Sequence, residues 1–472
     1  MASVLLQASS ILLPDLLIGR LGKHQHHSTS WMDGTRGLAA CIIASFHFLE
    51  AYIDMTGDGP LEALVIFFIF GGYGLAKRPL QLMMRPGDAV TQVKLLQTLS
   101  SSAFKRWFRL YVPMIIALAI TTLCAHSGAF EALRPLLAAP YKDDLFPGSM
   151  SPHIPRKWIN RQKQMDYWWK DVKSVVDIWP VDVIHARNSI YMWSIREEFR
   201  CSMHLYIVLL ASASMKPAGR LLILFLVSQY HLRCGRYEVM LYFAGACLAQ
   251  LELMWQERKR RLQADSGSAP PIGAQSPTFS RDLILQGVGL PIAAFLISGR
   301  SPGTYAYDIL VPAIKLYYND TFPRTICCAA GILIFAGCML LSSPDSTLHR
   351  LLNSKLIQYI CRRAFGMVLL QTIVLYSGVL AVPHLVWNVI GGEPESPADR
   401  DSKEKLLRLI GISAGVIANL VSLLWLSDIF TKTVIGPNEV FIKCLDKWLF
   451  IKDHGGSARK ATEEPIQTLD KE

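Results

Sequence analysis

The apolar residues of this chain are gathered into long blocks instead of recurring singly at helical or strand spacing. Blocks near 18 to 20 residues are long enough to cross a hydrocarbon core of roughly 30 Å. Hydrophobic residues make up 51% of the 472 residues and charged residues only 18%, whereas about 25% of a typical soluble domain is charged. We therefore predict an all-α polytopic membrane protein with about ten transmembrane helices in one bundle.

The apolar blocks define ten candidate transmembrane segments, with a margin of one or two in the count. Two of them are short, 202–215 and 220–232, and these are two half-helices, one hairpin that does not fully cross, or two full spans. The ten segments are 37–53, 61–76, 111–129, 202–215, 220–232, 238–255, 283–298, 326–342, 364–382 and 407–427.

The charges of the connecting loops predict the orientation. Basic residues are concentrated between the second and third segments, at 256–262 and at 349–363, whereas Asp54 and Asp58 follow the first segment. With ten spans and a cytoplasmic N-terminus, every strongly basic loop faces the cytoplasm, as the positive-inside rule requires. We expect both termini in the cytoplasm and an endomembrane location such as the endoplasmic reticulum. The net charge is +11, and the basic residues lie in loops beside apolar segments. This indicates that they face an anionic membrane surface and do not bind nucleic acid.

The chain divides into three predicted parts. Residues 1–30 form an N-terminal cytoplasmic or interfacial segment, 31–450 the transmembrane domain, and 451–472 a polar tail that we expect to be disordered. Within the domain, about 131–200 is an aromatic-rich lumenal segment and about 256–281 a cytoplasmic linker. Most of the ten cysteines lie in apolar blocks without C-x-x-C spacing, so we predict packing roles for them and no metal site.

Two ionisable side chains interrupt the first apolar segment, D-G-T-R-G-L-A-A-C-I-I-A-S-F-H (33–47). A charge at mid-span costs about 2.5–3.5 kcal/mol on insertion scales, so each needs a reason. Arg36 can snorkel to the interface and set topology. His47 lies eleven residues further on, about 16 Å deeper and on nearly the same helix face; a core histidine is the alternative. Asp33 precedes the expected helix and is placed to cap the amide of Arg36.

Three stretches together resemble the membrane acyltransferase-3 family. The opening D-G-x-R-G-x-A-A, with a histidine eleven residues after the arginine, is similar to the opening of that family. F-K-R-W-F-R-L-Y-V-P (104–113) resembles the family's R-x-x-R-[LI]-x-P element. W-S-I-R-E-E-F-R-C-S-M-H-L (193–205) and the ending 427–450 are similar to the fungal branch. The resemblance covers about 31–450 and implies an acyl-CoA-dependent O-acyltransferase.

Some positions depart from the family pattern. Thr35 replaces a common leucine, and Gly71-Gly72-Tyr73 stands where many relatives have S-G-F. Arg196 and Cys201 replace the usual proline and glycine around Glu198, which leaves the local role of that carboxylate open.

The resemblance implies a role for five residues. His47 is the expected general base, because an imidazole exchanges protons near neutral pH and an alcohol is a poor nucleophile there. Glu198 would orient His47 as a second catalytic residue; alternatively it binds the acceptor hydroxyl or pairs with Arg196 or Arg200. The donor-binding residues would be Arg36, Arg106 and Arg109, since guanidinium groups bind phosphates well; setting topology is the alternative.

The implied co-substrate is acyl-CoA, most simply acetyl-CoA, with no permanently bound cofactor. The expected acceptor is a hydroxylated small lipophilic metabolite, as in fungal secondary metabolism, which could approach through the bilayer; a glycan is the alternative. A transporter using His47 and Glu198 as a proton relay is a competing class, although no internal repeat supports it. An inactive scaffold for other membrane enzymes is a third possibility.

Overall fold

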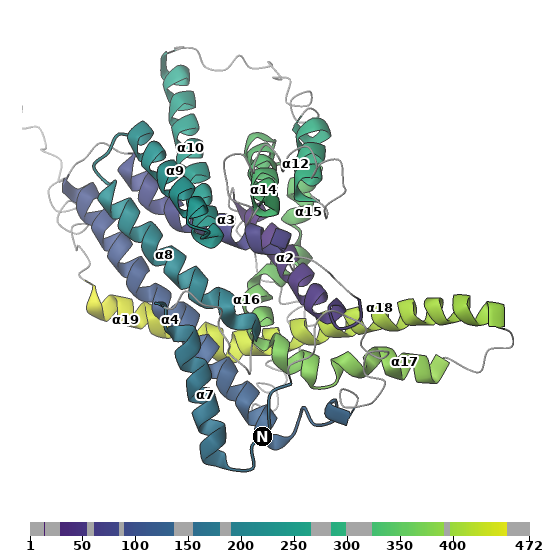
Figure 1. Cartoon of the computed structure of the whole chain (residues 1–472). Helices are drawn as coiled ribbons and strands as arrows, with labels where there is room; N and C mark the ends of the chain where they lie inside the picture. The colour runs from purple at the N-terminus through teal and green to yellow at the C-terminus, as the bar shows by residue number, and fades with distance from the viewer. Residues whose placement is uncertain are drawn as a thin grey trace, which may run out of the picture.

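The computed structural model describes residues 14, 29–53, 61–84, 89–135, 154–179, 190–265, 285–298, 323–390 and 397–450. These residues form helices and contain no strand, which confirms the all-α prediction. Helices α2 (Ser30–Leu49) and α16 (Lys355–Tyr376) pack on each other near the middle of the bundle (Figure 1). The predicted interfacial helix at the N-terminus and the polar tail 451–472 lie outside the described residues.

Each of the ten predicted segments overlaps a helix. Besides α2 and α16 these are α3 (Leu61–Met83), α4 (Ala89–Ser127), α8 (Trp193–Ala211), α9 (Pro217–Arg233), α10 (Tyr237–Asp265), η2 with α12 (Leu285–Gly289, Leu290–Ile297), α14 (Pro323–Leu341) and α18 (Pro397–Phe430). The remaining elements are α7 (Arg161–Val176), η1 (Ile190–Met192), α15 (Thr347–Leu352), η3 (Val379–Ala381), α17 (Val382–Ile390), η4 (Thr431–Ile435) and α19 (Gly436–Leu449).

Five helical stretches of the described chain are long and apolar enough to cross a membrane. They are Leu61–Met83, Ala89–Ser127, Arg324–Leu341, Lys355–Tyr376 and Lys405–Leu449. This agrees with the membrane class, and the count of ten stays a prediction.

The predicted helix boundaries were too narrow wherever a helix continues into charged sequence. α8 begins at Trp193 and not at residue 202, because Glu197 pairs with Arg196 and Arg200 inside the helix. α10 continues to Asp265, so the first part of the predicted linker 256–281 is helical. The predicted cap by Asp33 is wrong: α2 already begins at Ser30, and Asp33 lies exposed in its first turn.

The contacts of α2 show how its neighbours run. Gly37 packs on Cys361, and further along both helices the Gln371 amide donates to the Ala44 carbonyl, so α16 runs parallel to α2. Asn419 of α18 donates to the same carbonyl oxygen at 3.0 Å. Helix α3 runs antiparallel to α2. Arg36, early in α2, lies over the ring of Phe67, whereas Ile43, further along α2, packs with Ala63 near the start of α3. The bundle therefore has an Arg36 end and a His47 end.

Helix α3 lies between α2 and α10 and approaches α10 very closely. A Cβ atom at Gly245 would overlap the carbonyl oxygen of Ile69, and one at Gly72 would overlap the carbonyl oxygen of Tyr242. On the other side of the bundle, a buried ion group joins α16 to α18 and η4: Arg363 donates to Asp428 at 2.7 Å, and Lys432 lies 2.7 Å from the same carboxylate. These contacts fix the helices that surround the site.

Candidate active site

All five residues singled out in the sequence line one cavity of about 760 Å³. Its walls come from α2, α3, α4, α8, α16 and α19, with further residues from η1, α10 and η4. The predicted residues are Arg36, His47, Arg106, Arg109 and Glu198. Segments separated by several hundred residues in the sequence are therefore brought to a single chamber.

Arg36 and His47 lie on one face of α2, as predicted, since both side chains line the cavity. Eleven residues of helix separate them by about 16 Å along the axis. The cavity therefore extends along α2, with a cation near one end and an imidazole near the other.

His47 is held by two neighbours at its end of the cavity. Its Nδ1 lies 3.4 Å from Oε2 of Glu50, one turn further along α2. The ring of Tyr191, in η1, packs on the imidazole with 4.4 Å between ring centroids. Nε2 has no hydrogen-bond partner within the described part of the chain. With a proton on Nδ1, Nε2 offers its lone pair to the cavity.

Glu198 lies away from His47 and forms an ion pair with Arg106. The Arg106 guanidinium donates to Glu198 Oε1 at 2.5 Å, to the Ser202 hydroxyl at 3.1 Å and to the Tyr242 hydroxyl at 3.3 Å. The pairing with Arg196 or Arg200 that the sequence allowed belongs to Glu197 instead. The predicted contact between Glu198 and the imidazole is thus absent from the structure, because Glu198 is held further along α8, at the level of Arg106.

The other two arginines are less constrained. Arg36 lies 5.6 Å from the centroid of the Phe67 ring, and its Nε has no hydrogen-bond partner among the residues described. Arg109 pairs with Glu439 of α19 at 3.2 Å, with the two side chains 48% and 40% exposed. Exposed pairs of this kind contribute about 0–1 kcal/mol. Both guanidinium groups are therefore available to an anionic ligand in the cavity.

Sequence reasoning missed several residues of this site, of which Glu50, Tyr191 and Glu439 contact predicted residues directly. A signal existed for Glu50, because residues three apart on a helix are neighbours. No comparable signal links Tyr191 or Glu439 to their partners, since these contacts are long-range.

Other candidates lie outside the cavity. His204 is exposed beside His231, and His384 packs on Trp387 and Tyr52. Gly411–Gly415 reads G-x-S-x-G, the pattern of a nucleophilic serine in α/β-hydrolases, which needs a sharp turn between a strand and a helix. Here the pattern lies within α18, and its serine is exposed. It is therefore a packing feature, with Gly411 against Trp387 and Gly415 against Phe48.

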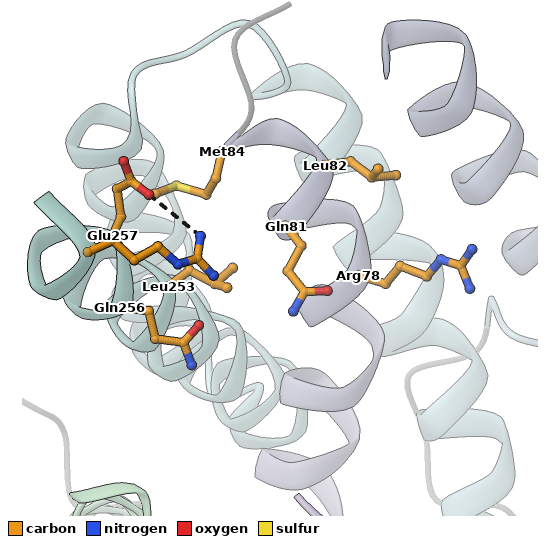
Figure 2. Close-up of a pocket in the computed structure, with 8 residues that line it drawn as sticks. Arg78, Gln81, Leu82, Met84, Leu253, Gln256 and Glu257 are labelled. Atoms are coloured by element: carbon orange, nitrogen blue, oxygen red, sulfur yellow. Dashed lines mark ion pairs between the residues drawn. The ribbon is translucent and has the colours of Figure 1, made fainter. Parts of the chain in front are cut away.

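A second, smaller cavity of about 300 Å³ lies between α3 and α10 (Figure 2). It contains Glu257 and Arg260, which are 3.7 Å apart, and Arg78 and Gln81 of α3. None of the five predicted residues contributes to it.

The comparison with known families decides the class of this protein. The family described as "Acyltransferase domain", the acyltransferase-3 family, matches residues 29–427. The chain belongs to the acyltransferase-3 family. This acyltransferase is also similar to the O-acetyltransferase PaAT-1 of Phomopsis amygdali, with 25% identity over 435 residues that cover 83% of this chain and 79% of the relative. No solved structure matches it. The chain is thus a membrane O-acyltransferase, and the fungal resemblance is supported.

Proposed function

We propose that this acyltransferase moves an acyl group, most simply acetyl, from acyl-CoA to a hydroxyl of a small lipophilic metabolite. The observation that carries the proposal is the single cavity with His47 near one end and Arg36 near the other. That layout suits a long donor with phosphates at one end and a thioester at the other.

The arginines supply the proposed donor site. Acyl-CoA is cytoplasmic and carries several phosphate charges, which guanidinium groups bind through paired hydrogen bonds. Arg36 has no carboxylate partner among the described residues, and Arg109 exchanges its exposed partner Glu439 for a phosphate at little cost. Arg106, whose charge is paired with Glu198 in the same cavity, is the third arginine of the proposed donor site. In this proposal the Arg36 end and both termini face the cytoplasm. We propose an endomembrane as the location, as the loop charges and the family resemblance led us to expect.

His47 supplies the proposed chemistry. Its Nε2 takes the proton of the acceptor hydroxyl while the oxygen attacks the thioester carbonyl carbon. The carbon–sulfur bond then breaks, and the departing thiolate receives the proton, which yields the ester and free CoA. The imidazolium formed on the way lies in the last turn of α2, where the helix dipole favours a positive charge.

The cavity wall near His47 favours an apolar acceptor. Phe46, Leu61, Leu64 and Trp193 line the cavity together with His47. Ligand sites of this kind select apolar molecules and orient them by a few polar groups. A hydroxylated lipophilic metabolite, such as those of fungal secondary metabolism, fits this wall better than a glycan does.

A direct test is CoA release by the purified protein given acetyl-CoA and extracts of its source. We expect free CoA and an acylated product of increased mass, both dependent on the extract. Movement of a substrate across the membrane of proteoliposomes without CoA release would instead support the transporter hypothesis. Comparing metabolites with and without the gene then identifies the acceptor, and an acylated glycan as the missing product would contradict the metabolite proposal.

Glu439→Gln tests the donor site. Removing the carboxylate frees Arg109, so we expect the KM for acetyl-CoA to fall about two- to fivefold, which corresponds to an exposed ion pair of about 0.5–1 kcal/mol. Steady-state kinetics measure it, with Glu257→Gln as control because Glu257 pairs with Arg260 and Arg261 outside this cavity. A rise in the KM of Glu439→Gln would contradict donor binding by Arg109.

A further inference from the structure

The carboxylate that faces His47 is Glu50, and the sequence assigned it no role. We propose that Glu50 is a positioning residue: it accepts a hydrogen bond from Nδ1–H of His47 and thereby keeps Nε2 as the base. This inference rests on the proposed function, in which His47 deprotonates the acceptor. Glu50 acts through His47 and does not itself touch the reacting atoms.

His47 and Glu50 form a close, largely buried pair at this end of the cavity. Glu50 Oε2 lies 3.4 Å from Nδ1, and the side chains of His47 and Glu50 are only 18% and 20% exposed. Both line the cavity, and Tyr191 packs on the imidazole ring. An imidazole fixed at one nitrogen by a carboxylate presents the other in one tautomer and orientation.

No other cavity carboxylate in the described chain serves this purpose. Besides Glu50 the cavity is lined by Glu198 and Glu439, which pair with Arg106 and Arg109 respectively. Glu50 has His47 as its ion-pair partner. Once the proton from the acceptor arrives on Nε2, Glu50 neutralises the imidazolium.

The position of Glu50 also argues against a role in helix stability. Glu50 is the C-terminal capping residue of α2, where the dipole of the helix disfavours a negative charge. The dipole at this end favours a positive charge, which His47, in the last turn, carries when it is protonated. A negative charge at a helix end that disfavours it, with His47 as its ion-pair partner among the described residues, points to a role in the site.

The test compares Glu50→Gln and Glu50→Ala with the full-length wild type. Glutamine keeps the size and an acceptor oxygen but removes the charge, so we expect kcat to fall about 10- to 100-fold, less than for a fully buried carboxylate. The KM for acetyl-CoA should stay within about twofold, because the donor phosphates bind at the other end. The Tm should stay equal or rise, since a charge opposing the helix dipole is removed.

Added formate supplies a readout that a purely structural role would not move. In Glu50→Ala the side chain is removed, and formate at high concentration should restore part of kcat by occupying the place of the carboxylate. Glu131→Gln is the matched control: Glu131 pairs with Arg134 at 2.8 Å outside the cavity, and this variant should keep wild-type kcat with no response to formate.

The outcomes separate this inference from the proposed function. If Glu50→Gln keeps wild-type kcat while His47→Ala is inactive, the role of Glu50 is wrong and the base stands. If both variants keep wild-type kcat, the proposed base is wrong as well. A loss of kcat in Glu50→Gln that comes with a lower Tm and no formate response in Glu50→Ala would make Glu50 a structural residue and overturn the inference.

Discussion

His47→Ala is expected to lower kcat for acyl transfer by about 10²- to 10⁴-fold, the usual contribution of a general base. The alcohol of the acceptor then lacks the imidazole that accepts its proton. The KM for acetyl-CoA should change little, because Arg36 and Arg109 are untouched. Release of CoA, followed with saturating donor and acceptor, measures the effect.

The fold should tolerate this change. Among the described residues, His47 has the 3.4 Å pair with Glu50 and ring contacts with Phe46 and Tyr191, so we expect a Tm within about 2–4 °C of the wild type. His204→Ala, an exposed histidine outside the cavity, should keep full activity. Wild-type turnover by a correctly folded His47→Ala variant would contradict the proposed mechanism.

Arg106→Met is expected to reduce both stability and activity. The change leaves the carboxylate of Glu198 without its partner in a site where Arg106 is only 10% and Glu198 28% exposed. Breaking a buried pair on one side costs about 3–5 kcal/mol, and partial exposure reduces this here to about 2–3 kcal/mol. Activity should fall at least about 100-fold, because the proposed donor site loses one of its three arginines. Thermal unfolding in detergent and CoA release measure the two effects.

A double variant separates the two roles of this pair. Arg106→Met with Glu198→Leu removes both charges, so stability should return to within about 1 kcal/mol of the wild type. Activity should stay low, because the donor site still lacks its arginine. Recovery of activity in the double variant would show that the pair serves the fold alone. Arg261→Met is the control for losing an arginine–glutamate pair at the surface, since Arg261 is 76% exposed.

The helices could be predicted from the sequence because apolar blocks have few alternatives in a membrane protein. Their ends could not, since the first turns of α8 contain Arg196, Glu197 and Arg200, whose charges are acceptable only because they pair within the helix. A hydropathy pattern records the charge of a residue but not its partner. The same limit explains why α10 extends beyond its apolar block.

The features of the candidate site likewise divide into those that the sequence predicts and those that it does not. Arg36 and His47 share a helix, so their spacing predicts their common face, and the structure agrees. Glu198 lines the same cavity as His47, yet its partner was not predictable, because Arg106 comes from α4 and Tyr242 from α10. Glu50 was within reach of a simple rule of helix spacing. The assigned roles of all these residues stay predictions until the variants are measured.

The glycine contact between α3 and α10 has a consequence for the shape of the cavity. α3 contributes Leu64 and Phe67 to the cavity wall on one side and meets α10 through Gly72 and Gly245 on the other. A Cβ atom at either glycine would overlap a backbone carbonyl oxygen, so α3 and α10 could not keep this separation. Two residues outside the cavity thus set where α3, and with it Leu64 and Phe67, stands in the cavity wall.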